Sequence, residues 1–280
     1  MKIAILSRQT GLYSNRRLLA AAAERNWQAA VIDPLQDKAE VGLWSAGFDA
    51  VIPRYSPYWQ NRAHGVLKRL QAMGIRSLND ADAIALARDA PACLQAFADS
   101  GLPFPQSISM RGGPLPADWL DRLPFAFPMV LKRHGSSQGQ GVELYRDSVA
   151  LADRIQTLID RHEPFLLQEF IAEAEASDLR LMVAGGRVIA AMQRTARSGE
   201  FRANMHLGGS ASPVKVDPDA CELAVRAVAA VGLRLAGVDI ILSRRGPLVL
   251  EINACPGFEA LEAVSGVDVA GKLLDLLEAA

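Results

Sequence analysis

The sequence predicts a mixed α/β (α+β) protein that begins with a parallel α/β domain and continues into a region rich in β-hairpins. Two observations predict this class. Over about the first 90 residues, short apolar runs alternate with segments of helical periodicity, as in a parallel sheet covered by helices. Farther along, apolar runs are joined by tight turns, and the Gly185-Gly186 pair within residues 179–192 is a strong hairpin signal.

The first region contains three expected strands and two expected helices. One helix carries Leu18, Leu19, Ala22 and Ala23 on a single stripe, and the other ends at Gly74. The expected strands cover 2–6, 29–33 and 49–54, and the expected helices cover 15–26 and 62–74.

Six prolines between residues 102 and 130 disfavour long helices and mark a boundary region. Beyond it we expect a strand that ends near Lys132, a strand at 165–170 and the hairpin within 179–192. A second hairpin is expected at 237–254, with its turn near residues 243–246.

Composition excludes several classes of protein. The 280 residues are half hydrophobic and carry a net charge of −1, which indicates a globular chain without a basic surface for nucleic acid. No apolar run approaches the length of a membrane helix, and the N-terminal run meets Arg8 too early for a signal peptide. Three scattered cysteines predict neither a disulfide framework nor a zinc site. We therefore expect a soluble cytoplasmic protein.

The second hairpin places oxygen-bearing side chains together. If its turn centres near residue 245, Asp239 lies across from Glu251, and alternation brings Asn253 to the same face. Opposed carboxylates repel unless a cation lies between them, and oxygen ligands without His or Cys favour Mg²⁺. A solvated acidic strand pair balanced by Arg244 and Arg245 explains the pattern equally well.

A glycine-rich segment follows the strand that ends at Lys132. Residues 135–141 read GSSQGQG and precede another apolar run. Backbone amides of such a loop, together with one lysine, suit a polyphosphate. The segment is neither a Walker A loop nor a dinucleotide fingerprint, because no Gly-Lys-Ser/Thr and no helix follows. On its own, a flexible connector between strands is as good an interpretation.

The motifs together resemble the ATP-grasp superfamily, and most closely the RimK-type α-L-glutamate ligases. The resemblance runs nearly end to end, and FRANMHLGG (201–209) and EINACPGFE (251–259) are its most specific segments. Other matching stretches are MKIAILSR, FDAVIPR, LKRHGSSQGQGV, LLQEFIAEA, SDLRLMV and AGVDII.

The resemblance implies an ATP-grasp fold behind an N-terminal pre-ATP-grasp domain. The expected boundaries are 1–92 for the N-terminal domain and 93–280 for the ATP-grasp domain. Within the latter we expect a lid subdomain over about 103–168 and a metal-binding subdomain over about 169–280.

The resemblance also implies roles for individual residues. Asp239, Glu251 and Asn253 would hold two Mg²⁺ ions (or Mn²⁺), with Glu251 bridging both. Arg202 and Asn204 would be catalytic at the phosphate end of ATP. The other expected nucleotide-binding residues are Lys132, Gln138, Gly139, Gly141 and Ala203 at the phosphates, Glu169 and Phe170 at the adenine, and Asp178 near the ribose.

Simpler interpretations of these residues stay open. Phe170 is equally well explained as a core aromatic. Asp178 and Arg180 also fit a surface ion pair, and Arg202 and Asn204 fit an ordinary polar loop.

The implied activity is an ATP- and Mg²⁺-dependent carboxylate–amine ligase that forms an acyl phosphate and adds glutamate or a similar amino acid. A carboxylate resists attack by an amine, and phosphorylation makes it a good electrophile. The alternatives are an ATP-grasp kinase and a nucleotide-binding regulatory protein with weak turnover. Expected partners are ATP, an amino acid, an acceptor (a protein tail, a carrier protein or a small cofactor) and further copies of the chain, but neither nucleic acid nor membrane.

The chain departs from the family pattern in three places. Asp89-Ala90 stands where relatives commonly have Asp-Lys, so a phosphate-binding lysine is missing. Leu207 replaces a frequent arginine on the acceptor side. Finally, Tyr55, Tyr58 and Trp59 match no family pattern, and they form either part of an acceptor pocket or a surface or interface patch.

Overall fold

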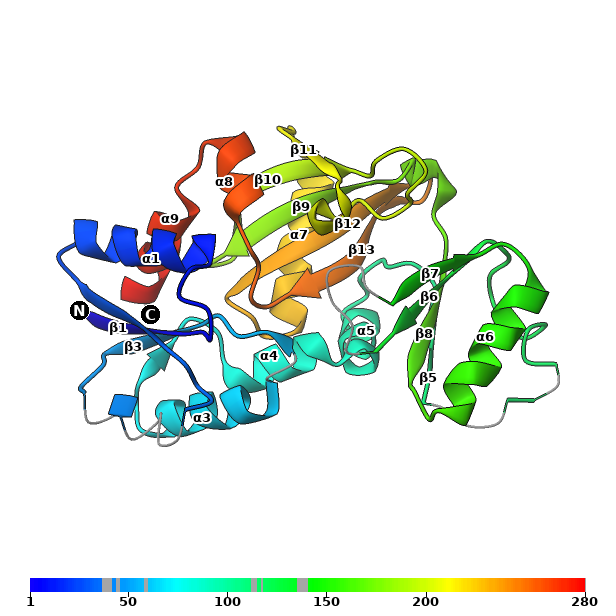
Figure 1. The fold of residues 1–280 in the computed structure, drawn as a ribbon. Coiled ribbons are helices and arrows are strands. Elements are labelled where there is room, and N and C mark those ends of the chain that lie inside the picture. Colours follow the sequence, from blue (N-terminus) through cyan, green and yellow to red (C-terminus); the bar gives the residue numbers. More distant parts are fainter. Residues whose placement is uncertain are drawn as a thin grey trace.

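A computed structural model describes residues 1–36, 42–43, 46–57, 60–111, 115–116, 118–134 and 141–279. The described chain contains three sheets (Figure 1). A four-stranded sheet has the order β2-β1-β3-β4, a five-stranded sheet the order β11-β10-β9-β12-β13, and a second four-stranded sheet the order β5-β8-β6-β7. The predicted mixed α/β class is confirmed.

The N-terminal sheet is parallel and buried on both faces. Ile3 and Ile5 of β1 pack into one hydrophobic core, whereas Ala4 and Leu6 pack into another. This burial explains the unbroken apolar run of β1. All five predicted elements form within two residues of their expected ends. The elements of this region are β1 (Lys2–Leu6), α1 (Tyr13–Glu24), β2 (Gln28–Ile32), β3 (Ala50–Pro53), α3 (Gln60–Ala72), β4 (Arg76–Ser77), α4 (Ala81–Arg88) and α5 (Ala90–Asp99).

The five-stranded sheet is antiparallel and contains both predicted hairpins. Ala184 pairs with Arg187 across the Gly185-Gly186 turn, where both glycines have positive φ, and Ser243 pairs with Gly246. Helix α7 packs against one face of the sheet. The elements are β9 (Ser177–Ala184), β10 (Arg187–Thr195), β11 (Ser210–Ser212), α7 (Pro218–Ala230), β12 (Leu235–Ser243) and β13 (Gly246–Asn253).

The third sheet, here called the lid sheet, has a core of its own. Side chains from β6, β8 and α6 form this core and are absent from the clusters beneath the other sheets. The lid sheet therefore packs as a separate layer. Its elements are β5 (Ser107–Met110), β6 (Met129–Arg133), β7 (Val142–Tyr145), α6 (Ser148–Asp160) and β8 (Phe165–Glu169).

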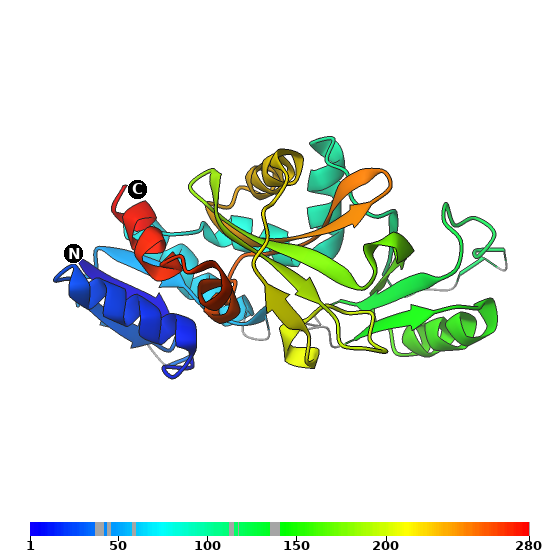
Figure 2. The same cartoon turned by 90° about the horizontal axis from the view of Figure 1, so that it is seen from above.

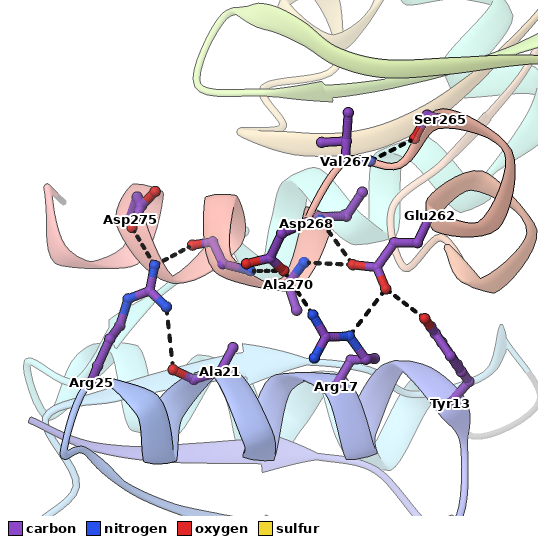
Figure 3. A network of polar contacts seen from close by, with 12 residues as sticks. Tyr13, Arg17, Ala21, Arg25, Glu262, Ser265, Val267, Asp268, Ala270 and Asp275 are labelled. Carbon is purple, nitrogen blue, oxygen red and sulfur yellow. Dashed lines mark hydrogen bonds and ion pairs between the residues drawn. The ribbon is translucent and has the colours of Figure 1, made fainter. Parts of the chain in front are cut away.

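The C-terminal helices α8 (Glu259–Ser265) and α9 (Val269–Glu278) return to the N-terminal domain, where α9 lies beside α1 (Figure 2). A polar network joins them (Figure 3). Glu262 accepts hydrogen bonds from the Tyr13 hydroxyl at 2.7 Å and from Arg17 Nε at 3.2 Å, and Arg25 pairs with Asp275 at 2.6 Å.

Leu273 and Leu277 of α9 share a core with Ile3 of β1. Residues on both sides of the expected boundary at residue 92 thus contribute to one hydrophobic core, and the expected domain and subdomain limits remain predictions. Among the described residues, no helix is both long and apolar enough to cross a membrane.

Candidate active site

Strands β12 and β13 place two predicted metal ligands opposite each other. Asp239 pairs with Glu251, as predicted. The turn at residues 243–246 would, in a regular ladder, put Asp239 opposite Leu250 instead. A one-residue bulge at Leu250 shifts the register and turns Glu251 toward the face of Asp239. The predicted carboxylate pair is confirmed, and the bulge is its physical cause.

The third predicted ligand, Asn253, lies at the end of β13 opposite Gly237. Its Oδ1 accepts a hydrogen bond from the amide of Cys255 at 2.9 Å, which starts the turn into Pro256. A Cβ added to Gly237 would lie 2.9 Å from both Arg180 Nη1 and Pro256 Cβ. Gly237 therefore leaves the space that the Arg180 side chain fills.

Buried charges of alternating sign surround Asp239, whose exposed fraction is 3%. Arg180, its cross-strand partner on β9, donates from Nη2 to Asp239 Oδ2 at 2.8 Å, and Arg194 of β10 reaches the same oxygen at 2.8 Å. Arg194 also donates from Nε and Nη2 to the two oxygens of Asp178, each at 2.7 Å. In this structure, Arg180 and Arg194 neutralise the carboxylates of Asp239 and Asp178.

Asp178 therefore forms a buried ion pair with Arg194 and not the surface pair with Arg180 considered from the sequence. Its exposed fraction is 8%, and both carboxylate oxygens are engaged. Loss of hydration and the nearby charge of Asp239 raise the pKa of Asp178. The expected ribose contact of Asp178 remains a prediction.

Glu251 differs from Asp239 because solvent reaches its side chain. Even so, loss of hydration among the surrounding atoms, and then the charge of Asp239, raise the pKa of Glu251. Lys132 on β6 of the lid sheet opposes this shift. Loss of hydration lowers the pKa of Lys132 itself, whereas Glu251 and Asp239 act to raise it. The predicted phosphate lysine thus lies within electrostatic range of the predicted metal carboxylates, although it belongs to another sheet.

These residues fit Mg²⁺ by their chemistry. Asp239 and Glu251 supply carboxylate oxygens, Asn253 supplies an amide oxygen, and the mutual repulsion of the carboxylates favours a cation between them. The described parts of the chain contain no group of three His, Cys, Asp or Glu side chains that could hold a metal ion. Magnesium bound here would complete its shell with phosphate oxygens and water.

Arg202 connects the 199–209 loop to the lid sheet. Its Nη2 lies 2.7 Å from Glu200 Oε2 and its Nε 2.9 Å from Glu200 Oε1, while Nη1 donates to the Val142 carbonyl of β7 at 3.3 Å. The hydrogen bonds from Arg202 lower the pKa of Glu200 to about 2. Glu200, which the sequence did not single out, therefore orients the predicted catalytic arginine.

Ala203 and Asn204 follow in the same loop. Ala203 is buried, whereas Asn204 is half-buried and its carbonyl accepts from the amides of Leu207 and Gly209 at 3.0 and 3.3 Å. A Cβ at Gly209 would lie 2.9 Å from the Ala203 carbonyl oxygen. Only glycine at position 209 allows the loop to close this tightly.

The two residues predicted at the adenine lie where β8 ends. Glu169 accepts from the Gln106 amide at 2.7 Å and forms a close ion pair with Arg245 of the β12–β13 turn. Phe170 is half-buried and meets Phe201 edge-on, with ring centroids 6.2 Å apart. Phe170 therefore contacts the loop that carries Arg202, and the adenine contacts remain predictions.

Part of the predicted phosphate loop lies outside the described residues, including Gln138 and Gly139. Gly141 is described and has φ of +70°. Its carbonyl accepts from the amide of Arg133 at 2.9 Å, which joins Gly141 to the end of β6.

Ala90 begins helix α5, for which the Asp89 side chain is the N-cap through the Ala92 amide at 3.0 Å. Loss of hydration lowers the pKa of His134, which follows the lid strand β6, and the charge of Asp89 opposes this shift. The contact of position 90 with ATP remains a prediction. Tyr58 and Trp59 lie outside the described residues, whereas Tyr55 is buried.

Sequence reasoning missed Asn79, whose exposed fraction is 1%. Its Nδ2 donates to the carbonyls of Leu235 and Ala254 at 2.8 and 3.0 Å, and its Oδ1 accepts from the amides of Arg234 and Leu235 at 3.0 and 2.9 Å. This side chain holds the start of β12 and the end of β13 together. A single asparagine in a loop gives no sequence signal for such contacts.

Two family models match the chain. The RimK PreATP-grasp domain covers residues 1–84, and the RimK-like ATP-grasp domain covers residues 87–277. The chain belongs to the RimK-like ATP-grasp family. Among relatives of this RimK-like protein, a "Probable alpha-L-glutamate ligase" of Xanthomonas campestris pv. campestris (strain 8004) is 42% identical over 292 residues, covering 100% of this chain and 99% of the relative. A protein of the same name from Thioalkalivibrio sulfidiphilus is 41% identical over 288 residues, covering 99% and 95%.

Solved structures show that the RimK-like chain has the ATP-grasp fold. The D-cycloserine synthetase DcsG matches with a TM-score of 0.79 at 21% identity, covering 99% of this chain and 98% of that one. The D-alanine–D-alanine ligase from Bacillus anthracis complexed with ATP matches at 0.77 with 16% identity, covering 100% and 96%. A RimK domain protein from Sphaerobacter thermophilus matches at 0.75 with 23% identity, covering 99% of both chains.

Proposed function

We propose that this ligase adds L-glutamate, or a similar amino acid, to an acceptor carboxylate through an acyl-phosphate intermediate. Membership of the RimK-like family makes the chain an ATP-dependent, ADP-forming ligase that uses ATP and Mg²⁺. The names of its relatives, which are 41–42% identical over nearly the whole chain, support glutamate as the amino acid. The observation that carries the proposal is the Asp239–Glu251 pair with Lys132 in electrostatic range.

The proposed reaction has two steps. A carboxylate oxygen of the acceptor attacks the γ-phosphorus of ATP, and ADP leaves. The amine of glutamate then attacks the acyl carbon, loses a proton and expels inorganic phosphate, which leaves an amide. Catalysis in both steps rests on positioning and charge neutralisation.

The residues of this chain divide those tasks. Asp239, Glu251 and Asn253 would hold the two Mg²⁺ ions. When bound, the ions would neutralise the terminal phosphates and draw electron density from the γ-phosphorus. Lys132 and Arg202 would contact the transferred phosphoryl group, and Glu200 would keep the guanidinium of Arg202 in place.

The remaining contacts of ATP would come from neighbouring loops. Glu169 and Phe170 would meet the adenine and Asp178 would lie near the ribose. Gln138, Gly139 and Gly141, together with Ala203 and Asn204, would line the phosphates. The acceptor is a protein tail, a carrier protein or a small cofactor, and an assembly of several copies of the chain remains a prediction.

Release of ADP from the purified protein, with and without added amino acids, tests the proposal. A ligase releases ADP in an amino-acid-dependent manner when a dialysed cell extract supplies the acceptor, and glutamate should stimulate most. Release that depends on the extract but not on any amino acid would indicate a kinase instead. Release that neither addition changes would contradict the ligase assignment.

A further inference from the structure

Arg54 is a buried cation that donates hydrogen bonds to neutral acceptors. It follows β3 directly, and its exposed fraction is 8%. Its Nη1 donates to the carbonyl of Pro256 at 2.7 Å and its Nη2 to the hydroxyl of Ser14 at 2.9 Å, whereas its Nε has no hydrogen-bond partner. Within the described ranges no Asp or Glu pairs with it, and the nearby titratable groups that affect its pKa are Cys255 and Arg88.

Tyr55, the next residue along the chain, and Arg88, whose charge acts on Arg54, add two more buried donors. The exposed fraction of Tyr55 is 3%, and its hydroxyl is buried without a hydrogen-bond partner. Arg88 donates from Nη2 to the Tyr55 carbonyl at 2.6 Å, and its Cζ lies over the Tyr55 ring, 4.8 Å from the centroid. The buried Nη1 of Arg88 has no hydrogen-bond partner. Arg88 is only half-buried, so the cluster approaches solvent on its side.

The guanidinium groups of Arg54 and Arg88 bring two positive charges close together, and each keeps a donor without a partner. A guanidinium stays charged at any physiological pH, so the two neighbouring arginines cannot relieve their repulsion by losing a proton. Buried charges are normally paired, and unpaired buried donors cost free energy. An anion that accepts several hydrogen bonds would balance these donors, and a carboxylate matches the planar guanidinium group.

The position of the cluster in the fold supports a ligand-binding role. The parallel sheet has the order β2-β1-β3-β4, so chain connections leave β1 and β3 in opposite directions. Ligands of open α/β sheets bind outside the carboxyl ends of strands at this switch point, and Arg54 and Tyr55 follow β3 there. Cys255 connects the cluster to the proposed metal site, because its Sγ donates to the Pro53 carbonyl at 3.4 Å and its amide binds Asn253 Oδ1.

We propose that Arg54, Tyr55 and Arg88 form a binding site for a substrate carboxylate that is not phosphorylated in the reaction. This inference rests on the proposed ligase function, which supplies two sources of such a group. One is the free glutamate, and the other is an acceptor that carries further carboxylates. Ser14, at the start of α1, adds a helix N-terminus that favours negative charge near Arg54.

Calorimetric titration without ATP tests the site. The probes are L-glutamate, a glutamyl-glutamate dipeptide, glutarate and the uncharged diamide of glutarate. The wild-type protein should bind at least one of the two glutamate probes and glutarate, but not the diamide. Tyr55→Phe and Arg88→Gln should each weaken binding about tenfold or more, since each removes a hydrogen bond to a charged group. Lys68→Gln removes one exposed positive charge on α3 and should bind like the wild type.

Tyr55→Phe also separates binding from a structural role. Because the buried hydroxyl has no partner, its removal should leave the thermal midpoint of the ligand-free protein unchanged or raised. The proposal would be overturned if no carboxylate bound the wild type, if both variants bound as tightly as it does, or if Tyr55→Phe lowered the ligand-free midpoint by several degrees. Tighter binding of glutamate than of the dipeptide would assign the site to the free amino acid, and the reverse to the acceptor.

These titrations contain no nucleotide, so they are independent of the ADP-release test. Carboxylate binding without amino-acid-dependent ADP release would retain the site and refute the ligase proposal. Amino-acid-dependent ADP release, combined with carboxylate binding that neither variant alters, would support the ligase proposal and refute the site.

Discussion

Replacing Asn79 with alanine should destabilise the protein far more than its loop position suggests. The substitution removes four hydrogen bonds, three of them buried and each 2.8–3.0 Å long, to residues at the start of β12 and just after β13. At about 1 kcal/mol of net stability per hydrogen bond, the free energy of unfolding should fall by about 4 kcal/mol. Asn79→Asp should cost at least as much, because it turns a carboxylate toward the carbonyls of Leu235 and Ala254.

Urea denaturation followed by fluorescence measures this loss, with the slope of the transition checked for each variant. Asn61→Ala, at an exposed position of α3, is the matched control and should change stability by less than about 0.5 kcal/mol. Binding of Mn²⁺ with an ATP analogue should also weaken in Asn79→Ala at temperatures where the variant is folded. A loss below about 1 kcal/mol would refute the view that Asn79 holds the β12–β13 hairpin.

Three further predictions concern the nucleotide and metal sites. Glu251→Gln should lower turnover by at least about 100-fold while the fold survives, since the charge is lost at nearly constant volume; full turnover of the purified variant would refute the metal assignment. Ala90→Lys should tighten binding of a non-hydrolysable ATP analogue by about ten- to a hundred-fold, measured by calorimetry, and unchanged binding would mean that position 90 does not face the phosphates. Glu200→Gln should lower kcat about tenfold by releasing Arg202, equally at every pH above about 5, because the pKa of Glu200 is about 2. A loss confined to low pH would contradict this role.

The sequence predicted the elements well because their signals are local. Each predicted strand and helix of the N-terminal sheet forms within two residues of its expected ends, and both glycine-containing turns lie where expected. The Asp239–Glu251 pair was also correctly predicted, but from a turn centre that was slightly displaced. The bulge at Leu250 compensates for this displacement, and no sequence pattern announces a bulge in an apolar run.

Contacts between distant segments could not be predicted. Arg194 lies 16 residues from Asp178 and its guanidinium also meets Asp239, so the charge network depends on three strands being assembled. Likewise, Arg54 reaches Pro256 only because the C-terminal segment returns to the N-terminal sheet. Side-chain periodicity describes one element at a time, whereas these partners are fixed by how the sheets pack.

Incorporation of isotope-labelled glutamate tests the central claim most directly. A dialysed cell extract is incubated with ATP, Mg²⁺ and labelled glutamate, together with either the wild-type protein or Glu251→Gln, and the products are analysed by mass spectrometry. The proposed ligase predicts an acceptor whose mass increases by one or more labelled glutamyl residues in amide linkage, only with ATP and only with the wild-type protein. An acceptor that gains phosphate and no glutamate, or glutamate incorporation that persists undiminished with Glu251→Gln, would contradict the account.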